Sequence, residues 1–262
     1  MFNNGNGGEG GSVLLLSDFG EADLFVTELK QAILAAEPGL KFIDLTHHVP
    51  AFDVGHAAYL IEQSLALAEP GAVILAAIDP DQSCPLLAWQ SASHFFVGPD
   101  NGVFDRVSGS WLRGVQLHSN DGRTGPFRIR DVLAPLAAKL AVGGNLFDLG
   151  EGMERPDGWP RHEWSSLQNG QSLMVKVIHI DGFGNVILDQ PHRLIHSDRV
   201  IASVQDCRFT GLRSRITGPA ESRIVLAGSG GYVELCQVQG SAAASTGLKP
   251  GDMIRLIGVS NG

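Results

Sequence analysis

Cysteine is scarce in this chain of 262 residues, and the few cysteines are scattered. Cys84, Cys207 and Cys236 are odd in number, lie far apart and match no C-x-x-C or Cys/His spacing. Neither a disulfide framework nor a zinc site is therefore expected. We expect three free thiols, which fits a protein of the reducing cytosol.

Charged residues and long apolar runs are also few. Charged side chains make up 18% of the chain, and the net charge is −9. The chain thus lacks the basic face of a nucleic-acid-binding protein, although a small cationic substrate is compatible. No apolar run reaches the ~18 residues of a membrane span, and residues 1–11 lack the cationic start and apolar stretch of a signal peptide. We expect a soluble cytoplasmic protein whose partners include neither nucleic acid nor membrane.

Common phosphate- and cofactor-binding motifs are missing as well. The chain has no P-loop, no G-x-S-x-G elbow, and no G-x-G-x-x-G run after its first predicted strand, where residues 17–20 read Ser-Asp-Phe-Gly. This Asp-Phe-Gly is not a kinase metal motif, because no HRD-type loop or glycine-rich loop precedes it. The adjacent side chains of His47 and His48 diverge and have no evident third ligand. The pair therefore predicts a turn or hydrogen-bonding role, and no metal site is expected.

What the chain does have is a set of apolar runs that end in an aspartate. Residues 13–16 lead to Asp18, residues 72–78 to Asp79, and residues 173–180 to Asp181. The first two runs predict buried strands of a parallel sheet, and ligands bind at the carboxyl ends of such strands. A carboxylate there needs a partner to offset lost solvation, such as a ligand rich in hydroxyl and cationic groups. Each aspartate could instead serve only its turn.

The first half of the chain alternates strand and helix signals. It predicts a helix over 22–37, a strand over 41–45, a helix over 54–68 capped by Asp53, the strand 72–78, a hairpin of 86–90 with 93–97, and a helix over 131–141. This βαβαβ order predicts a parallel sheet with right-handed crossovers.

The second half is rich in short strand signals separated by turn residues. These signals cover 172–180, 184–188, 198–203, 222–227, 231–238 and 253–258. Their spacing is typical of a small barrel or sandwich. We predict a disordered tail over 1–11, an α/β N-terminal domain with a mostly parallel sheet over 12–150, a linker over 151–169, and an all-β, barrel-like C-terminal domain over 170–262.

Short motifs along the chain follow one another in a recognisable order. In the first half they are Ser17-Asp18-Phe19-Gly20, Asp44-Leu45-Thr46-His47, Asp79-Pro80, Phe96-Val97-Gly98-Pro99-Asp100-Asn101-Gly102 and Arg130-Asp131-Val132-Leu133-Ala134-Pro135. In the second half they are Asp181-Gly182-Phe183-Gly184-Asn185, Gly231-Tyr232-Val233-Glu234 and Gln239-Gly240-Ser241-Ala242-Ala243. Together they resemble the S-adenosylmethionine hydroxide adenosyltransferase family, which is similar to the fluorinases and chlorinases, over residues 12–258.

The resemblance implies a fold, an assembly and a reaction. It implies an α/β domain followed by a barrel-like domain, in a homotrimer whose ligand binds between one subunit's first domain and a neighbour's second. Water, hydroxide or halide attacks C5′ of the S-adenosylmethionine ribose, and methionine departs. No cofactor is expected beyond this nucleoside substrate. Because a sulfonium leaves as a neutral thioether, the enzyme needs no acid and must instead align and desolvate the nucleophile.

The resemblance also implies roles for individual residues. Asp18 accepts both ribose hydroxyls, and Phe52 packs against the ribose or thioether face. In the second domain Asp181 and Asn185 hold the ammonium and carboxylate of the methionine part. The backbone of residues 229–232, with Ser229 and Tyr232 at its ends, reads adenine. Each of these residues could also be a plain turn or core residue.

Departures from the family pattern fall on the expected catalytic set of Asp, Arg and His. Asp79 matches the Asp, but the loop over 79–85 is shorter than expected and contains no arginine. Arg128 stands where the histidine is expected, and an arginine stays protonated, so it cannot act as a general base. A halogenase is disfavoured because Asp79 would repel a halide. Two hypotheses remain: an S-adenosylmethionine hydrolase in which Arg128 supplies the missing cation beside Asp79, and a catalytically weak nucleoside-binding protein.

Overall fold

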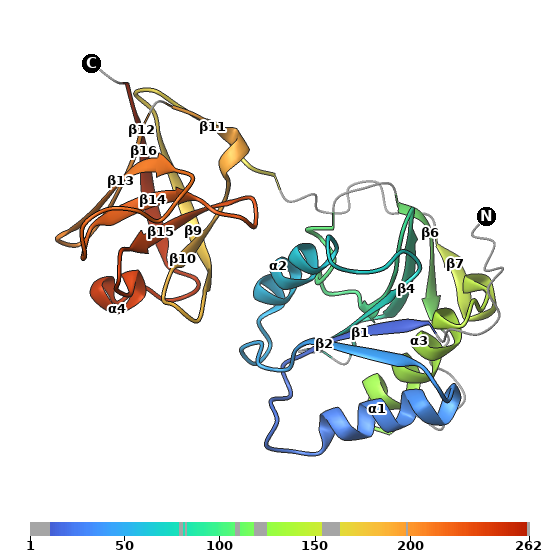
Figure 1. Cartoon of the computed structure of the whole chain (residues 1–262). Helices are drawn as coiled ribbons and strands as arrows, with labels where there is room; N and C mark the ends of the chain where they lie inside the picture. The colour runs from blue at the N-terminus through green and yellow to red at the C-terminus, as the bar shows by residue number, and fades with distance from the viewer. Residues whose placement is uncertain are drawn as a thin grey trace. The chain divides into compact units, whose positions relative to one another are not determined.

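A computed structural model of the chain describes residues 11–78, 81, 83–107, 111–117, 125–153, 163–197 and 199–260. The chain divides into two compact units, Met1–His162 and Glu163–Gly262, and each is described by itself (Figure 1). The first unit is built on a sheet with a parallel half, and the second is a closed barrel. The predicted fold class is confirmed. The predicted tail lies outside the described residues, apart from Gly11.

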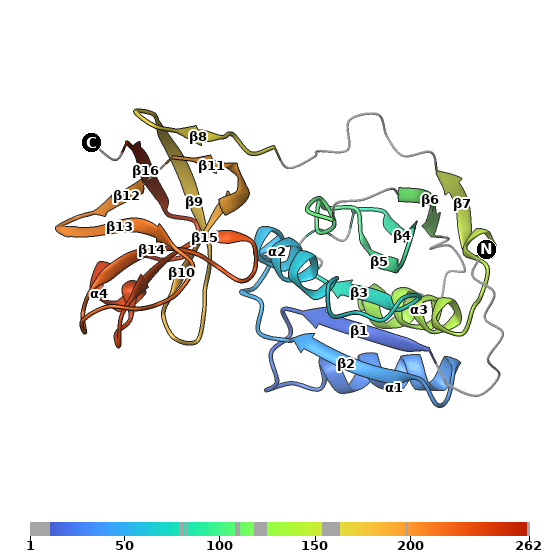
Figure 2. The same cartoon turned by 45° about the horizontal axis from the view of Figure 1, so that its top comes forward.

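The sheet of the first unit has the strand order β2-β1-β3-β5-β4-β6-β7. Its strands are β1 Ser12–Ser17, β2 Lys41–Thr46, β3 Val73–Ala77, β4 Leu86–Ser91, β5 Phe95–Pro99, β6 Trp111–Leu117 and β7 Gly150–Met153. The pairs among β2, β1, β3 and β5 are parallel, and the pairs from β5 through β4 and β6 to β7 are antiparallel (Figure 2). The predicted hairpin is therefore the antiparallel pair of β4 and β5.

Helices cover both faces of this sheet because its strands are apolar on both sides. The side chains of Val13 and Leu15 pack with α1, Phe25–Ala36, and α3, Ala134–Ala141. Those of Leu14 and Leu16 pack on the opposite face with α2, Val54–Ser64. The predicted cap of α2 is present, since Asp53 Oδ1 accepts a hydrogen bond from the His56 amide at 2.9 Å. Helix α2 ends at Ser64, earlier than the predicted residue 68.

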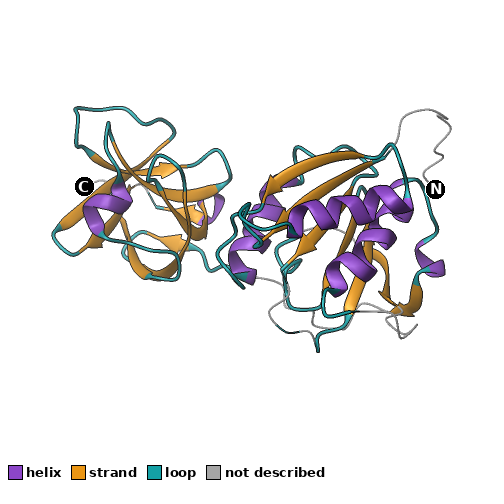
Figure 3. Ribbon diagram, turned by 90° about the horizontal axis from the view of Figure 1, so that it is seen from below, coloured by secondary structure: helices purple, strands orange, loops and turns teal. Residues whose placement is uncertain are grey.

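The second unit is built mostly of strands (Figure 3). These strands form a closed barrel with the order β10-β15-β14-β13-β12-β16-β9. The strands are β9 Ser172–Ile180, β10 Val186–Pro191, β12 Arg199–Val204, β13 Cys207–Arg213, β14 Arg223–Ala227, β15 Tyr232–Gln237 and β16 Met253–Val259. Inward side chains such as Val177, Phe209 and Leu235 fill its core. The short helix α4, Ala242–Thr246, follows β15.

Several elements differ from those the sequence predicts. Strands β13 and β6 were not predicted. Strand β13 carries two arginines and Gly211, so it has no continuous apolar pattern. Most of β7 and all of β8, Leu167–Gln168, fall inside the predicted linker over 151–169. The segment Ile129–Leu133 before α3 is a π-helix, a form that often marks functional sites. Among the described residues, no helix has the length and apolar character to cross a membrane.

The parallel register brings the ends of three strands to one edge of the sheet. Ser17 at the end of β1 pairs with Ala77 of β3, and Leu16 pairs with Thr46 of β2. The turn after β1 and the turn after β2 therefore lie side by side. Two backbone hydrogen bonds join them, from Gly20 to His47 at 2.7 Å and from Val49 to Ser17 at 3.3 Å.

Close packing of Trp89 against Gly114 generates a prediction about the sheet. The two residues are paired across β4 and β6, Trp89 is buried, and a methyl group on Gly114 would overlap its indole ring. Gly114→Ala should lower the free energy of unfolding by about 1–3 kcal/mol through overpacking. Gly152→Ala on β7 is the matched control, since its methyl would lie at an ordinary 3.7 Å from Phe147. Equal stability of the two variants in urea unfolding would contradict this packing.

Candidate functional site

A pocket of about 270 Å³ opens at the carboxyl edge of the parallel strands, entirely within the first unit. Its walls come from the turn after β1, the start of α1, the loop before α2 and the segment before α3. The lining residues are Asp18, Phe19, Phe25, Ala51, Phe52, Pro126, Phe127, Arg128 and Ile129. Three of the predicted site residues, Asp18, Phe52 and Arg128, are thus brought together from distant parts of the sequence.

Asp18 is held against the loop that carries Phe52. The Phe52 amide donates to Asp18 Oδ2 at 2.8 Å, and Phe52 adopts a left-handed backbone with φ 64°. The hydrogen bond supports a conformation that costs a non-glycine residue about 1–2 kcal/mol. Oδ1 of Asp18 has no hydrogen-bond partner within the described part of the chain. The carboxylate therefore keeps acceptor capacity for a hydroxyl donor in the pocket.

Three phenylalanine rings form one wall of the pocket. The centroids of Phe19, Phe25 and Phe127 lie 5.5–5.6 Å apart in tilted and edge-on pairs. Arg130 stacks on Phe127 with its guanidinium carbon 5.2 Å from the ring centroid, and it also pairs with Glu28 at 2.8 Å. The stacking and the ion pair hold Phe127 in this wall. An aromatic wall of this kind suits flat apolar groups and diffuse cations.

Arg128 reaches from this segment to the loop that follows Asp79. Its Nη1 donates to the Cys84 carbonyl at 2.6 Å, and its Nη2 donates to the Asp81 carbonyl at 3.1 Å. A hydrogen bond from Ser83 lowers the pKa of Asp81, and the charge of Arg128 lowers it further. Asp79, the predicted catalytic aspartate, lies outside the described residues. The guanidinium is therefore placed on the loop that leads away from Asp79.

Asn101 and Asp100 form a support for this loop that the sequence analysis did not assign. The Asn101 side-chain amide donates to the carbonyl of Ile78, the residue before Asp79, at 2.8 Å. The Asp100 amide donates to the Pro85 carbonyl at 2.8 Å, and burial raises the pKa of the Asp100 carboxyl. The sequence signal for this support is the Pro-Asp-Asn-Gly turn over residues 99–102. Its residues hydrogen-bond to both ends of the loop after β3, at Ile78 and at Pro85.

Asp181 and Asn185 lie in the second unit, where they build a tight turn between β9 and β10. Asp181 Oδ1 accepts from the amides of Phe183 and Asn185, both at 2.9 Å, and Oδ2 accepts from the Asn185 side chain at 2.8 Å. The turn role that the sequence left open is thus present for Asp181. Phe183 at the tip of the turn is 84% exposed.

Ser229 and Tyr232 lie at the other end of β10. Tyr232 pairs with Pro191, whereas Leu235 pairs with Val186 beside Asn185, so the barrel does not bring the two predicted groups together. Ser229 is exposed and lies in a turn. In this turn the Gly231 amide donates a hydrogen bond to the Gly228 carbonyl at 3.1 Å. The Tyr232 ring is buried against Trp164, so its side chain does not face outward.

A row of titratable side chains on the outside of the barrel was also missed. The register places His179, Ile187 and Glu234 side by side on three neighbouring strands. Cys236 lies two residues beyond Glu234 on the same face of β15. Burial raises the pKa of Glu234 and lowers that of His179, with Asp181 close to both. Burial and the neighbouring acids raise the pKa of Cys236 to about 12, so it stays a neutral thiol. No group of three or more metal-ligating side chains occurs among the described residues.

A pocket with a carboxylate and an aromatic wall at the carboxyl edge of parallel strands defines a protein that binds small molecules in an α/β domain. The chain matches the SAM hydroxide adenosyltransferase N-terminal domain over residues 13–150 and the C-terminal domain of the same family over residues 175–255. The chain belongs to this family, and the resemblance drawn from its motifs is confirmed.

Individual relatives cover nearly the whole chain. A protein of Thermus thermophilus named (R)-S-adenosyl-L-methionine hydrolase is 31% identical, with 94% of this chain and 99% of that protein covered. A Salinispora tropica protein of the same name is 31% identical over 92% and 95% of the two chains. A solved structure of a conserved hypothetical protein from Thermus thermophilus is 30% identical with a TM-score of 0.72, over 94% of this chain and 99% of that one. An uncharacterized conserved protein from Thermotoga maritima, 23% identical over the same shares of the two chains, has the same fold with a TM-score of 0.83.

The bond between Asp18 and the Phe52 amide generates a second prediction. Asp18→Ala should lower the free energy of unfolding by about 1 kcal/mol, because a strained backbone loses its hydrogen bond. In a Phe52→Gly background the same change should cost less, since glycine adopts this φ without support. Asp23→Ala, an exposed acid of the same loop, is the control. A cost of Asp18→Ala that is equal in both backgrounds, measured by urea unfolding, would rule the support out.

Proposed function

We propose that this protein hydrolyses S-adenosyl-L-methionine to adenosine and L-methionine. The observation that carries the proposal is the match to both domains of the family, together with a pocket that joins Asp18, Phe52 and Arg128. The oxygen of a water or hydroxide forms a bond to C5′ of the ribose, and the C5′–S bond breaks. The bonding pair leaves with sulfur as a neutral thioether, and the proton of the water passes to solvent.

The pocket offers a suitable partner for each part of such a substrate. The free acceptor Oδ1 of Asp18 takes a ribose hydroxyl in a charge-assisted hydrogen bond. The rings of Phe19, Phe25 and Phe127 face the sulfonium region, where an aromatic face stabilises positive charge and keeps water out. The reaction as proposed needs no metal and no cofactor.

In this proposal Arg128 acts as a cation and not as a general base. Its guanidinium lies on the carbonyls of Asp81 and Cys84, in the loop that leaves Asp79. A cation near Asp79 keeps that carboxylate ionised, and the carboxylate then orients one water toward C5′. The binding-protein hypothesis is compatible with the same contacts, because an arginine stays protonated at neutral pH and cannot act as a general base.

The remaining site residues come, in this proposal, from a neighbouring subunit. Asp181 and Asn185 hold the ammonium and carboxylate of the methionine part, and the backbone at Ser229 and Tyr232 contacts adenine. The exposure of Ser229 and of Phe183, at the tips of two turns of the barrel, supports such a role. A homotrimer would then carry composite sites.

Turnover is the direct test of this function. Purified protein incubated separately with the two sulfonium epimers of S-adenosyl-L-methionine should release adenosine slowly, and in labelled water the 5′-hydroxyl should carry oxygen-18. Both epimers are needed because the relatives are named for the (R) form. Asp79→Ala should abolish release and leave binding nearly intact, whereas Asp206→Ala, an exposed turn acid of the barrel, should change neither.

The outcomes separate the two functions. Saturable binding of either epimer with no adenosine after hours would establish the binding protein. Arg128→His restores the residue that the resemblance implies, so a gain of activity would place the deficit at that one position. Absence of both binding and turnover at millimolar concentration would remove the whole proposal.

Composite sites predict a specific result when variants are mixed. Asp18→Ala and Asn185→Ala should each be inactive alone, and co-expression should restore about a quarter of wild-type activity, because a random trimer then contains some intact sites. Light scattering should give the mass of three chains of 27.8 kDa. A trimer that shows no complementation would place each site within one subunit, and a monomer would remove the assembly.

A further inference from the structure

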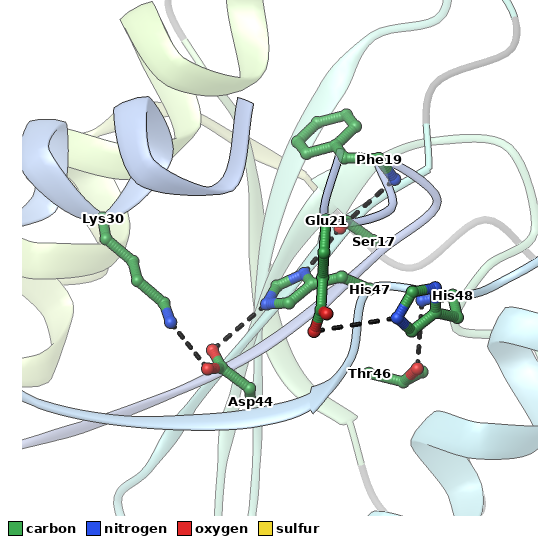
Figure 4. A network of polar contacts seen from close by, with 8 residues as sticks. All are labelled: Ser17, Phe19, Glu21, Lys30, Asp44, Thr46, His47 and His48. Atoms are coloured by element: carbon green, nitrogen blue, oxygen red, sulfur yellow. Dashed lines mark hydrogen bonds and ion pairs between the residues drawn. The ribbon is translucent and has the colours of Figure 1, made fainter. Parts of the chain in front are cut away.

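A chain of polar side chains joins three elements of the first unit, next to the turn that carries Asp18 (Figure 4). Lys30 of α1 contacts Asp44 Oδ2 of β2 at 2.6 Å. His47, in the turn after β2, places Nε2 3.2 Å from Asp44 Oδ1 and Nδ1 2.7 Å from the hydroxyl of Ser17. The Ser17 Oγ in turn accepts from the Phe19 amide at 3.5 Å. The chain thus ends in the backbone of the turn that carries Asp18.

Charge fixes the direction of these contacts. Burial alone would raise the pKa of Asp44, but the hydrogen bond and the charge of Lys30, together with the close contact of His47 Nε2, outweigh it and hold the pKa below its ordinary value. The ionised carboxylate can only accept, so it favours the proton on the nearer ring nitrogen of His47, Nε2. Nδ1 is then an acceptor for the Ser17 hydroxyl, whose own oxygen faces the Phe19 amide.

Backbone contacts make the same residue a clamp between two turns. The His47 carbonyl accepts from Gly20 at 2.7 Å, and the Val49 amide donates to the Ser17 carbonyl at 3.3 Å. The turn after β1 presents Asp18, and the segment after His47 leads to Phe52, the amide partner of Asp18. His47 therefore ties together the two stretches of chain that shape this corner of the pocket.

Burial assigns His47 a supporting role rather than contact with a ligand. The side chain of His47 is 5% exposed and Ser17 is fully buried, and neither lines the pocket. A buried imidazole is costly to desolvate unless its nitrogens are paired, so an apolar residue would fill the space more cheaply. What the imidazole adds is a directed hydrogen bond to Ser17.

We propose that His47, aligned by Asp44 and acting through Ser17, is a positioning residue that sets the Asp18 carboxylate for the ribose hydroxyls of the ligand. This inference rests on the proposed nucleoside function. It goes beyond that function by assigning hydroxyl recognition to a residue that never touches the ligand.

The experiment compares two probes by calorimetry, adenosine and 2′,3′-dideoxyadenosine, which lacks both hydroxyls. Wild type should bind adenosine about tenfold more tightly, the loss expected when a charged acceptor is left unpaired. Asp18→Ala should reduce this ratio toward one. His47→Leu, which fills the space without a hydrogen bond, should reduce it similarly, and the double variant should lose no more than either single variant.

Matched variants distinguish positioning from general damage. His47→Asn, whose side-chain oxygen can take the place of Nδ1, should recover part of the ratio, and Ser17→Ala should lose it even if the His47 variants fail to fold. His48→Ala is the control, because this adjacent histidine is 65% exposed and lies 3.7 Å from Glu21. It should keep the wild-type ratio.

Each remaining outcome decides one question. A wild type that binds adenosine with the expected ratio, combined with His47→Leu and Ser17→Ala variants that keep that ratio, overturns the positioning role and leaves the proposed function standing. Additive losses from Asp18→Ala and His47→Leu overturn it as well. A folded wild type that binds neither probe at millimolar concentration overturns the proposed function and this inference with it.

Discussion

The parallel register of β2, β1 and β3 is the constraint on which the rest of the site depends. Because Ser17 pairs with Ala77 and Leu16 with Thr46, all three strands end along one row of the sheet. Beyond that row the backbone amides and carbonyls lose their ladder partners and must find others. The turns supply them, in the bonds from Gly20 to His47 and from Asn101 to Ile78. The polar residues gather at this edge because the ladder stops there.

The same edge explains why one pocket can hold a carboxylate beside three phenyl rings. Asp18 is kept partly solvated and is hydrogen-bonded to the Phe52 amide, so its charge is not stranded in an apolar cavity. The rings are supported by Arg130, which stacks on Phe127 and pairs with Glu28. The charged wall and the apolar wall thus each have their own contacts within the protein. Neither wall depends on a bound ligand to keep its shape.

Local sequence predicts what depends on neighbours along the chain, and it fails where distant segments decide. The apolar runs, their acidic ends and the Asp53 cap were predictable because each is encoded within a few residues. Strand β6 was not predicted because the glycine in it, Gly114, is explained only by the close packing of Trp89 on the paired strand β4. A hydrogen-bonding role for His47 was predictable from its divergent neighbour, but its partners Ser17 and Asp44 are set by register. Likewise, nothing near Arg128 indicates its contacts with Asp81 and Cys84.

The contacts of Arg128 show why a guanidinium suits this position. Cys84 is half-buried, and its carbonyl needs a donor, whereas the carbonyl of the exposed Asp81 also accepts from the Cys84 amide at 3.0 Å. A guanidinium carries five donors on a long stem and can serve two carbonyls at once, as Arg128 does for Asp81 and Cys84, whereas an imidazole cannot span both. A cation thus reaches this loop from outside it, from the segment before α3. Replacing Arg128 by histidine would therefore remove both guanidinium hydrogen bonds to the Cys84 and Asp81 carbonyls.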